Sequence, residues 1–281
     1  MWRNVLFLVG VSCFLLAEER NDSLAEEKES YDLIGFTNDN FADEMNRKAF
    51  FCLNWQQLVK ENREYLYKIL AGKEAFRVDL GRDELPLGGR IAFVNGIDTT
   101  VEEEMIFLAL ISDICGGFNV YGVYHQTLGP VNDILAAAAE VSDPYFESQA
   151  VSEVIKVWKD FFQKDKENCF LQMCTSQGSA IVRNALTLIT PEERKRIIVV
   201  VISPAAIIDD TLCRRVDHYI STNDYVYMLD MQHVLTAKKS TLHFLIPHKD
   251  APSFDHNFAS PTFRDRIKGH ILQYVNNPKG L

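Results

Sequence analysis

Ser176 lies in a pentapeptide whose residue types are typical of a nucleophile elbow, the sharp turn that joins a strand to a helix. The pentapeptide reads Cys174-Thr175-Ser176-Gln177-Gly178. Small residues on both sides of the serine allow such a turn to form without clashes, and they place the hydroxyl at the helix N-terminus. The chemistry that this predicts is nucleophilic attack of the serine hydroxyl on a carbonyl carbon. The alternative is an ordinary strand–turn–helix in which Ser176 only caps the helix.

An acid and a base follow the serine in the order that this kind of site needs. A catalytic serine of this type is followed along the chain first by Asp or Glu and then by His. Asp224 comes just beyond the predicted strand at 216–221, and His256 lies between the last predicted strand and the last predicted helix. We therefore predict that Ser176, Asp224 and His256 form a catalytic triad. The alternatives are a turn aspartate and a surface histidine.

Other histidines compete with His256 for the role of the base. His248 lies only two residues beyond the strand at 242–246, whereas His256 stands on a loop long enough to fold back over the serine. Phe258 is placed to hold that loop against the domain. His218 and His243 fall within predicted strands, and we expect them to be structural.

A second loop supplies the remaining part of a predicted oxyanion hole. Asn95-Gly96-Ile97-Asp98 follows the apolar run at 90–94. The backbone N–H of Gly96 or Ile97, together with that of Gln177, is predicted to stabilise the negative charge that develops on the attacked carbonyl oxygen. The alternative is a plain Asn-Gly turn after a strand.

The elements that must position these residues follow a strand–helix rhythm from residue 90 onward. Such apolar runs, separated by helices, predict a doubly wound, mostly parallel α/β sheet with helices on both faces. The predicted strands are 90–94, 119–124, 169–174, 197–202, 216–221 and 242–246. The predicted helices are 48–71, 101–115, 131–141, 151–163, 181–189 and 260–275. We expect the strongly β-branched run 197–202 to lie in the middle of the sheet.

The N-terminal part of the chain differs from the rest in charge and hydropathy. Residues 1–17 hold an uncharged apolar run of thirteen residues after Arg3, which predicts a signal peptide or a short membrane anchor. Residues 18–45 hold ten Asp or Glu against two basic residues, and so most of the net charge of −10. We divide the chain into the leader 1–17, an acidic, weakly ordered linker 18–47 and an α/β-hydrolase-like domain 48–281. An exported or membrane-associated protein is the expectation.

Composition also excludes several classes of partner and cofactor. The negative charge argues against nucleic acid, which needs clustered Lys and Arg. The six cysteines form no Cys-x-x-Cys pair and no Cys/His zinc spacing, and we expect buried structural thiols. No metal and no organic cofactor is expected. The expected partner is a small-molecule or lipid acyl substrate, with membrane association through the N-terminus.

Several of these segments together resemble an uncharacterised family of chlamydial α/β-hydrolase-like proteins. The resemblance covers roughly residues 48–276, and four segments carry it: 93–97, the elbow with Val182 to Leu186, 197–206 and Asp255-His256. That family typically has His-Ser-Gln-Gly at the elbow, whereas this chain has Thr175 before the serine. The resemblance implies the α/β-hydrolase fold and no particular substrate.

The function predicted from these residues is hydrolysis of an ester or thioester by a serine hydrolase. Two alternatives remain open at this point. One is an inactive binding module of the same fold, which Cys174 and Thr175 would favour if they distorted the elbow. The other is a membrane-tethered interaction protein whose leader and acidic segment matter more than its pocket.

Overall fold

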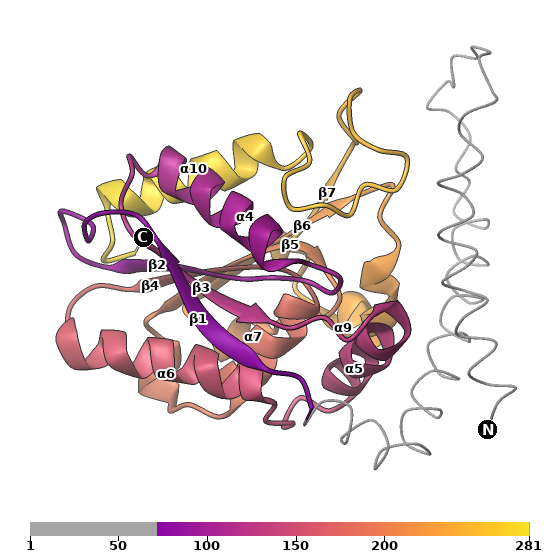
Figure 1. The fold of residues 1–281 in the computed structure, drawn as a ribbon, viewed down its shortest axis with the longest axis horizontal. Coiled ribbons are helices and arrows are strands. Elements are labelled where there is room, and N and C mark those ends of the chain that lie inside the picture. The colour runs from indigo at the N-terminus through magenta and orange to yellow at the C-terminus, as the bar shows by residue number, and fades with distance from the viewer. Residues whose placement is uncertain (1–71, 281) are drawn as a thin grey trace, which may run out of the picture.

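A single mixed sheet forms the centre of the molecule in the computed structural model, which describes residues 72–280 (Figure 1). Its seven strands have the order β1-β3-β2-β4-β5-β6-β7. β2 to β7 are parallel to their neighbours, and only β1 runs antiparallel, along β3. The strands are β1 (Ala75–Leu80), β2 (Arg90–Val94), β3 (Val120–His125), β4 (Phe170–Ser176), β5 (Ile197–Pro204), β6 (Arg215–Ser221) and β7 (Leu242–Leu245).

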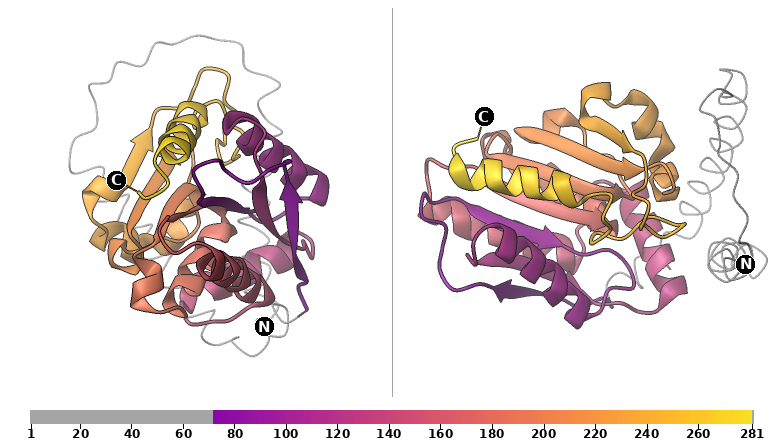
Figure 2. Two further views of the ribbon diagram at one scale, coloured as in Figure 1. Left: turned by 90° about the vertical axis from the view of Figure 1, so that its left-hand side faces the viewer. Right: turned by 90° about the horizontal axis from the view of Figure 1, so that it is seen from above.

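Helices cover both faces of this sheet, as the left-hand view of Figure 2 shows. α4 and α10 lie on one face, and α6 and α7 lie on the other. The α-helices are α4 (Val101–Ile114), α5 (Pro130–Ser142), α6 (Gln149–Lys164), α7 (Gln177–Thr187), α8 (Pro191–Arg194), α9 (Met231–Thr236) and α10 (Arg264–Asn276). Within residues 72–280 there are also three short 3-10 helices, η1 (Asp210–Leu212), η2 (Val226–Asp230) and η3 (Lys239–Thr241).

Two hydrophobic cores explain why the central strands are apolar on both sides. In β5, Val199 and Val201 pack into the core under α6 and α7, while Val200 and Ile202 pack into the core under α4 and α10. A strand buried on both faces needs an uninterrupted apolar run, which is the pattern that the sequence shows. The predicted α/β-hydrolase-like fold is confirmed, and β5 lies inside the sheet between β4 and β6.

The observed elements differ from the predicted ones most clearly at β1, α7 and α10, and the short helices α8 and α9 were not predicted either. β1 was not predicted, because it is an edge strand in which only Ala75 is fully buried and Phe76 is 43% exposed. α7 begins at Gln177 and not at residue 181, directly after the strand. α10 begins at Arg264 and not at residue 260, because hydrogen-bonded turns occupy the preceding residues.

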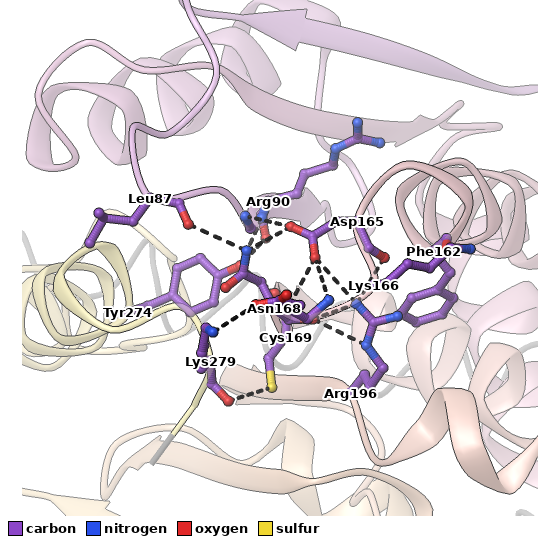
Figure 3. A network of polar contacts seen from close by, with 12 residues as sticks. Leu87, Arg90, Phe162, Asp165, Lys166, Asn168, Cys169, Arg196, Tyr274 and Lys279 are labelled. Carbon is purple, nitrogen blue, oxygen red and sulfur yellow. Dashed lines mark hydrogen bonds and ion pairs between the residues drawn. The ribbon is translucent and has the colours of Figure 1, made fainter.

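A polar network holds the sheet together at the end opposite the predicted site (Figure 3). The Tyr274 hydroxyl accepts a hydrogen bond from the backbone N–H of Arg90 at 2.7 Å, which links α10 to the start of β2. The Asp165 carboxylate accepts from the N–H of Asn168 at 2.8 Å, and Arg196 donates to the carbonyl of Asn168 at 2.6 Å. These contacts fix the starts of β2, β4 and β5, so that the loops at their other ends rest on a rigid base.

Three predicted segments lie outside the described residues: the leader 1–17, the acidic linker 18–47 and the helix 48–71. Within residues 72–280, no helix combines the length and the apolar character that a membrane crossing requires. The four cysteines of this part, Cys115, Cys169, Cys174 and Cys213, are buried free thiols.

Candidate active site

Ser176 occupies a strained turn between β4 and α7. Its backbone has φ 50° and ψ −125°, and the helix starts at the next residue. A non-glycine residue with positive φ costs free energy and persists only when its surroundings hold it. The Ser176 side chain forms no capping hydrogen bond with α7, so the helix-cap alternative lacks its defining contact.

The loop that follows β5 holds this strained turn in place. The carbonyl oxygen of Ser176 accepts hydrogen bonds from Ala205 N–H at 3.2 Å and from the Ser179 hydroxyl at 2.6 Å. The Ser179 oxygen in turn accepts from the N–H groups of Ala205 and Ala206 at 3.1 and 2.9 Å. One serine in the first turn of α7 therefore ties the elbow to the neighbouring strand.

Two glycines let the elbow approach the loop after β2. A Cβ atom built at Gly178 would lie 2.6 Å from the carbonyl oxygens of Val94 and Asn95, and one built at Gly96 would lie 2.7 Å from the Cβ of Ser176. Real Cβ atoms do not approach other atoms so closely, and in the first case the obstacle is backbone. The glycine two residues after the serine is therefore required by packing.

Gly178→Ala is expected to destabilise the protein by about 1–3 kcal/mol, the usual range for overpacking a rigid site. The matched control is Gly269→Ala, since Gly269 is also helical but a Cβ there meets nothing within 4 Å. That control should gain roughly 0.5–1 kcal/mol from alanine's higher helix propensity. Urea unfolding of both variants measures the difference, and a Gly178→Ala protein as stable as wild type would contradict the close approach described here.

His256 lies between Ser176 and Asp224 in one hydrogen-bonded chain. Its Nε2 is 2.9 Å from the Ser176 hydroxyl oxygen, and its Nδ1 is 2.9 Å from Asp224 Oδ2. A carboxylate only accepts, so Nδ1 carries the proton and Nε2 is free to accept the hydroxyl proton. Asp224 is fully buried, the side chain of His256 is 18% exposed, and Ser176 is 6% exposed. The arrangement has the order and the geometry of a nucleophile, a base and an orienting acid.

Local contacts fix the loops that carry the acid and the base. Asp224 follows β6 in a turn where its backbone N–H donates to the carbonyl of Ser221 and its Oδ1 accepts from Val226 N–H at 2.9 Å. His256 is stacked on Phe254, with ring centroids 5.5 Å apart. Phe258 is buried against Phe93, with ring centroids 4.6 Å apart, and so anchors the loop as the sequence suggested.

The competing histidines have other contacts. The side chain of His248 is 45% exposed and lies beside Asp250. His243 pairs with Asp217 at 3.0 Å. His218 is buried, its Nε2 accepts from Ile208 N–H, and burial lowers its pKa to about 4. The structure thus brings His256, and neither His248 nor the strand histidines, to Ser176.

The predicted oxyanion-hole residues lie around Ser176. Gly96 is packed against the Ser176 side chain, and Ile97 follows it in the same loop. Gln177 is the first residue of α7, where backbone N–H groups have no acceptor within the helix. The structure therefore brings both arms of the predicted oxyanion hole to the serine, and the donation of their N–H groups to a substrate oxygen stays a prediction.

Three functional candidates near the elbow were not predicted from the sequence: Ser179, His125 and Glu140. Ser179 follows the motif and looked like any small helix residue. His125 and Glu140 contact the site only through the pairing of β2 with β3 and through the packing of α5 on α7. No local spacing signals such contacts.

Comparison with known protein families identifies the chain's relatives. The family model described as "Protein of unknown function (DUF687)" matches residues 89–249, more than half of the chain. The chain belongs to that family. The description assigns DUF687 no activity and names no organism, so the chlamydial resemblance stays a prediction. No curated protein matches the chain.

Solved structures similar to this DUF687 member are distant. An α/β serine hydrolase without lid from Xanthomonas campestris is 12% identical, with a TM-score of 0.37 over 72% of this chain and 94% of that one. Esterase PE8 is 10% identical, with a TM-score of 0.43 over 72% and 98%. A cutinase-like protein from Cryptococcus sp. is 12% identical, with a TM-score of 0.37 over 68% and 95%.

Proposed function

We propose that this DUF687 protein is a serine hydrolase that cleaves an ester or thioester. The observation that carries the proposal is the chain Ser176–His256–Asp224, with 2.9 Å at both contacts and the serine held at a strained elbow. Backbone strain of this kind clusters at active sites, ligand clamps and switch regions. The location proposed from residues 1–17, exported or membrane-associated, suits a small-molecule or lipid acyl substrate.

The geometry supports acyl transfer in two steps. Ser176 Oγ attacks the substrate carbonyl while His256 Nε2 takes the hydroxyl proton, and Asp224 stabilises the charged imidazole. His256 then gives the proton to the leaving alcohol or thiol, which leaves an acyl group on Ser176. A water molecule, activated by the same histidine, releases the acid and restores the serine. The N–H groups of Gly96 or Ile97 and of Gln177 would stabilise the oxyanion in both steps.

The residues that depart from the usual elbow motif lie away from this chain of contacts. Cys174 is fully buried in the core under α6 and α7, and burial raises the pKa of its thiol, which makes it a poor nucleophile. Thr175 is 5% exposed and has no described hydrogen bond to Ser176, His256 or Asp224. Cys174 and Thr175 therefore do not distort the elbow in the way that would favour an inactive binding module.

A fluorophosphonate probe tests the proposal without knowledge of the substrate. Wild-type protein is expected to form a covalent adduct on Ser176, located by mass spectrometry of the labelled peptide, because the probe reacts with activated serines. Ser176→Ala protein should remain unlabelled. Folded wild-type protein that fails to react would favour the inactive binding module. A panel of short- and long-chain model esters then defines the acyl group.

A further inference from the structure

A small polar cavity lies next to the elbow, lined in part by Gln177, the residue after Ser176. It has a volume of about 10 Å³, close to the lower limit for one water molecule. Its polar lining consists of Lys73, His125, Glu140, Ser148 and Gln177. All five residues are buried, with at most 6% exposure. Buried polar groups in such number need mutual hydrogen bonds, and these bonds lead to both arms of the predicted oxyanion hole.

The first arm, Gln177, is held through its side chain. Gln177 Nε2 donates to Glu140 Oε2 at 2.6 Å, and Glu140 also receives a hydrogen bond from the Ser148 side chain. Arg183 and Asn184 donate from α7 to the backbone carbonyl of Glu140 at 3.0 and 3.2 Å. The last turns of α5 are therefore fixed on α7, and Glu140 restrains the residue whose backbone N–H is a predicted oxyanion donor.

The second arm, the loop after β2, is held by His125. The carbonyl oxygen of Asn95 lies 3.0 Å from His125 Nε2, and Asn95 Oδ1 accepts from His125 N–H at 3.0 Å. Asn95 Nδ2 donates to the carbonyl of Gly96 at 2.9 Å. Since a carbonyl only accepts, Nε2 carries the proton. Burial lowers the pKa of His125 to about 3, so the ring is neutral at neutral pH and Nδ1 is an acceptor.

The polar atoms that line the cavity and can still form hydrogen bonds determine which molecule can occupy it. His125 Nδ1 and Gln177 Oε1 are buried acceptors with no partner among the described residues. Lys73 forms an ion pair with Asp133 at 2.8 Å and still has N–H groups to donate. A water molecule donates twice and accepts from the ammonium, which matches this set. An anion would face two acceptors, and a metal cation would face the Lys73 charge.

We propose that Glu140 and His125 are positioning residues of the oxyanion hole, and that one buried water shared with Lys73 joins its two arms. The inference rests on the proposed serine hydrolase function. Oxyanion donors stabilise a transition state only when they are held in place before the reaction. Here Glu140 restrains Gln177, and His125 restrains Asn95 and, through it, Gly96. The shared water fixes these two pairs of residues relative to each other.

Two variants at Glu140 separate positioning from simple packing. Glu140→Gln keeps an oxygen that accepts from Gln177 Nε2, whereas Glu140→Leu removes it. With p-nitrophenyl acetate, kcat of the leucine variant should fall about tenfold or more with KM nearly unchanged, less than the 10²–10³-fold loss on removing an oxyanion donor outright. The glutamine variant should retain kcat within about threefold. Fluorophosphonate labelling rates should change in parallel.

Gln177→Met provides the same test if Glu140→Leu does not fold. It keeps the backbone N–H and the length of the side chain but loses the tether, so the same selective fall in kcat is expected. His125→Phe, which removes the donor to Asn95, should act likewise, and a high-resolution crystal structure should show the water beside His125 Nδ1.

The outcomes distinguish the two proposals. Wild-type protein that does not react with the probe overturns the serine hydrolase and this inference together. Reactive wild-type protein whose Gln177→Met and His125→Phe variants keep full kcat overturns the positioning role alone. A cavity without the water overturns the link between the two arms.

Discussion

Ser176→Ala is expected to lower kcat for any accepted ester by a factor on the order of 10³ or more. The variant removes the only group in the described site that both contacts His256 Nε2 and lies at the strained elbow. Water would then have to attack without a covalent intermediate, and only binding and the oxyanion donors would remain. Steady-state kinetics on the best ester of the panel, with labelling by the fluorophosphonate probe, gives the factor.

The same variant should leave the fold intact, which separates a chemical role from a structural one. The Ser176 hydroxyl caps no helix and bonds only to His256 in the described structure. The melting temperature should therefore stay unchanged or rise slightly, as is common when a strained site loses its function. If Ser176→Ala unfolds the protein, the helix-cap interpretation is the better one. If it keeps most of its activity, the proposed mechanism is wrong.

Ser203→Ala is the matched control. Ser203 is also a buried serine with positive φ, 49°, and it lies at the end of β5, beside the elbow. Its hydroxyl has no described hydrogen-bond partner. Removing it should leave kcat within about threefold and stability unchanged or higher, because an unsatisfied buried polar group is lost. A loss of activity equal to that of Ser176→Ala would show that the effect comes from disturbing the elbow.

The parallel strands could be predicted because burial on both faces leaves an uninterrupted apolar run. The run at 197–202 shows this, and it lies inside the sheet. The edge strand β1 has no such run, and it was missed for that reason. Phe76 and Val78 alternate with Arg77 and Asp79, which is the period-two pattern of a half-buried strand. The centre of this sheet is therefore marked by continuous apolar runs, and its edge by alternation.

The candidate site also has residues that could be predicted from the sequence and residues that could not. The order of Ser176, Asp224 and His256 along the chain follows from how parallel strands bring their carboxyl ends to one edge, and the structure brings the three within hydrogen-bond distance. The contacts of His125 and Glu140 depend on side-chain packing between distant segments, 30 residues apart in one case and 37 in the other. No periodicity or motif carries that information.

Asp224→Asn is expected to lower kcat by a factor on the order of 10³–10⁴ at neutral pH, as a triad acid replaced by its amide does. The reason is the hydrogen-bond pattern around residue 224. Val226 N–H donates to Oδ1, so an asparagine would keep its oxygen there and turn its NH₂ group toward His256. His256 Nδ1 would then have to accept, which moves the ring proton to Nε2, and Nε2 could no longer take the proton of Ser176.

Asp217→Asn is the control that isolates this effect, because Asp217 forms the same kind of pair with His243, at 3.0 Å against 2.9 Å. Asp217 lies four residues before Ser221 on β6, about 13 Å along the strand, and so toward the opposite end of the sheet. This control should keep kcat within about threefold.

Adding Asp224→Asn to Ser176→Ala should cost almost nothing further in kcat, since members of a triad act as one unit. Equal losses for Asp217→Asn and Asp224→Asn would mean that both act through the stability of β6, which melting curves would reveal. Full activity of Asp224→Asn would mean that another group orients His256, and the role assigned to Asp224 would be wrong.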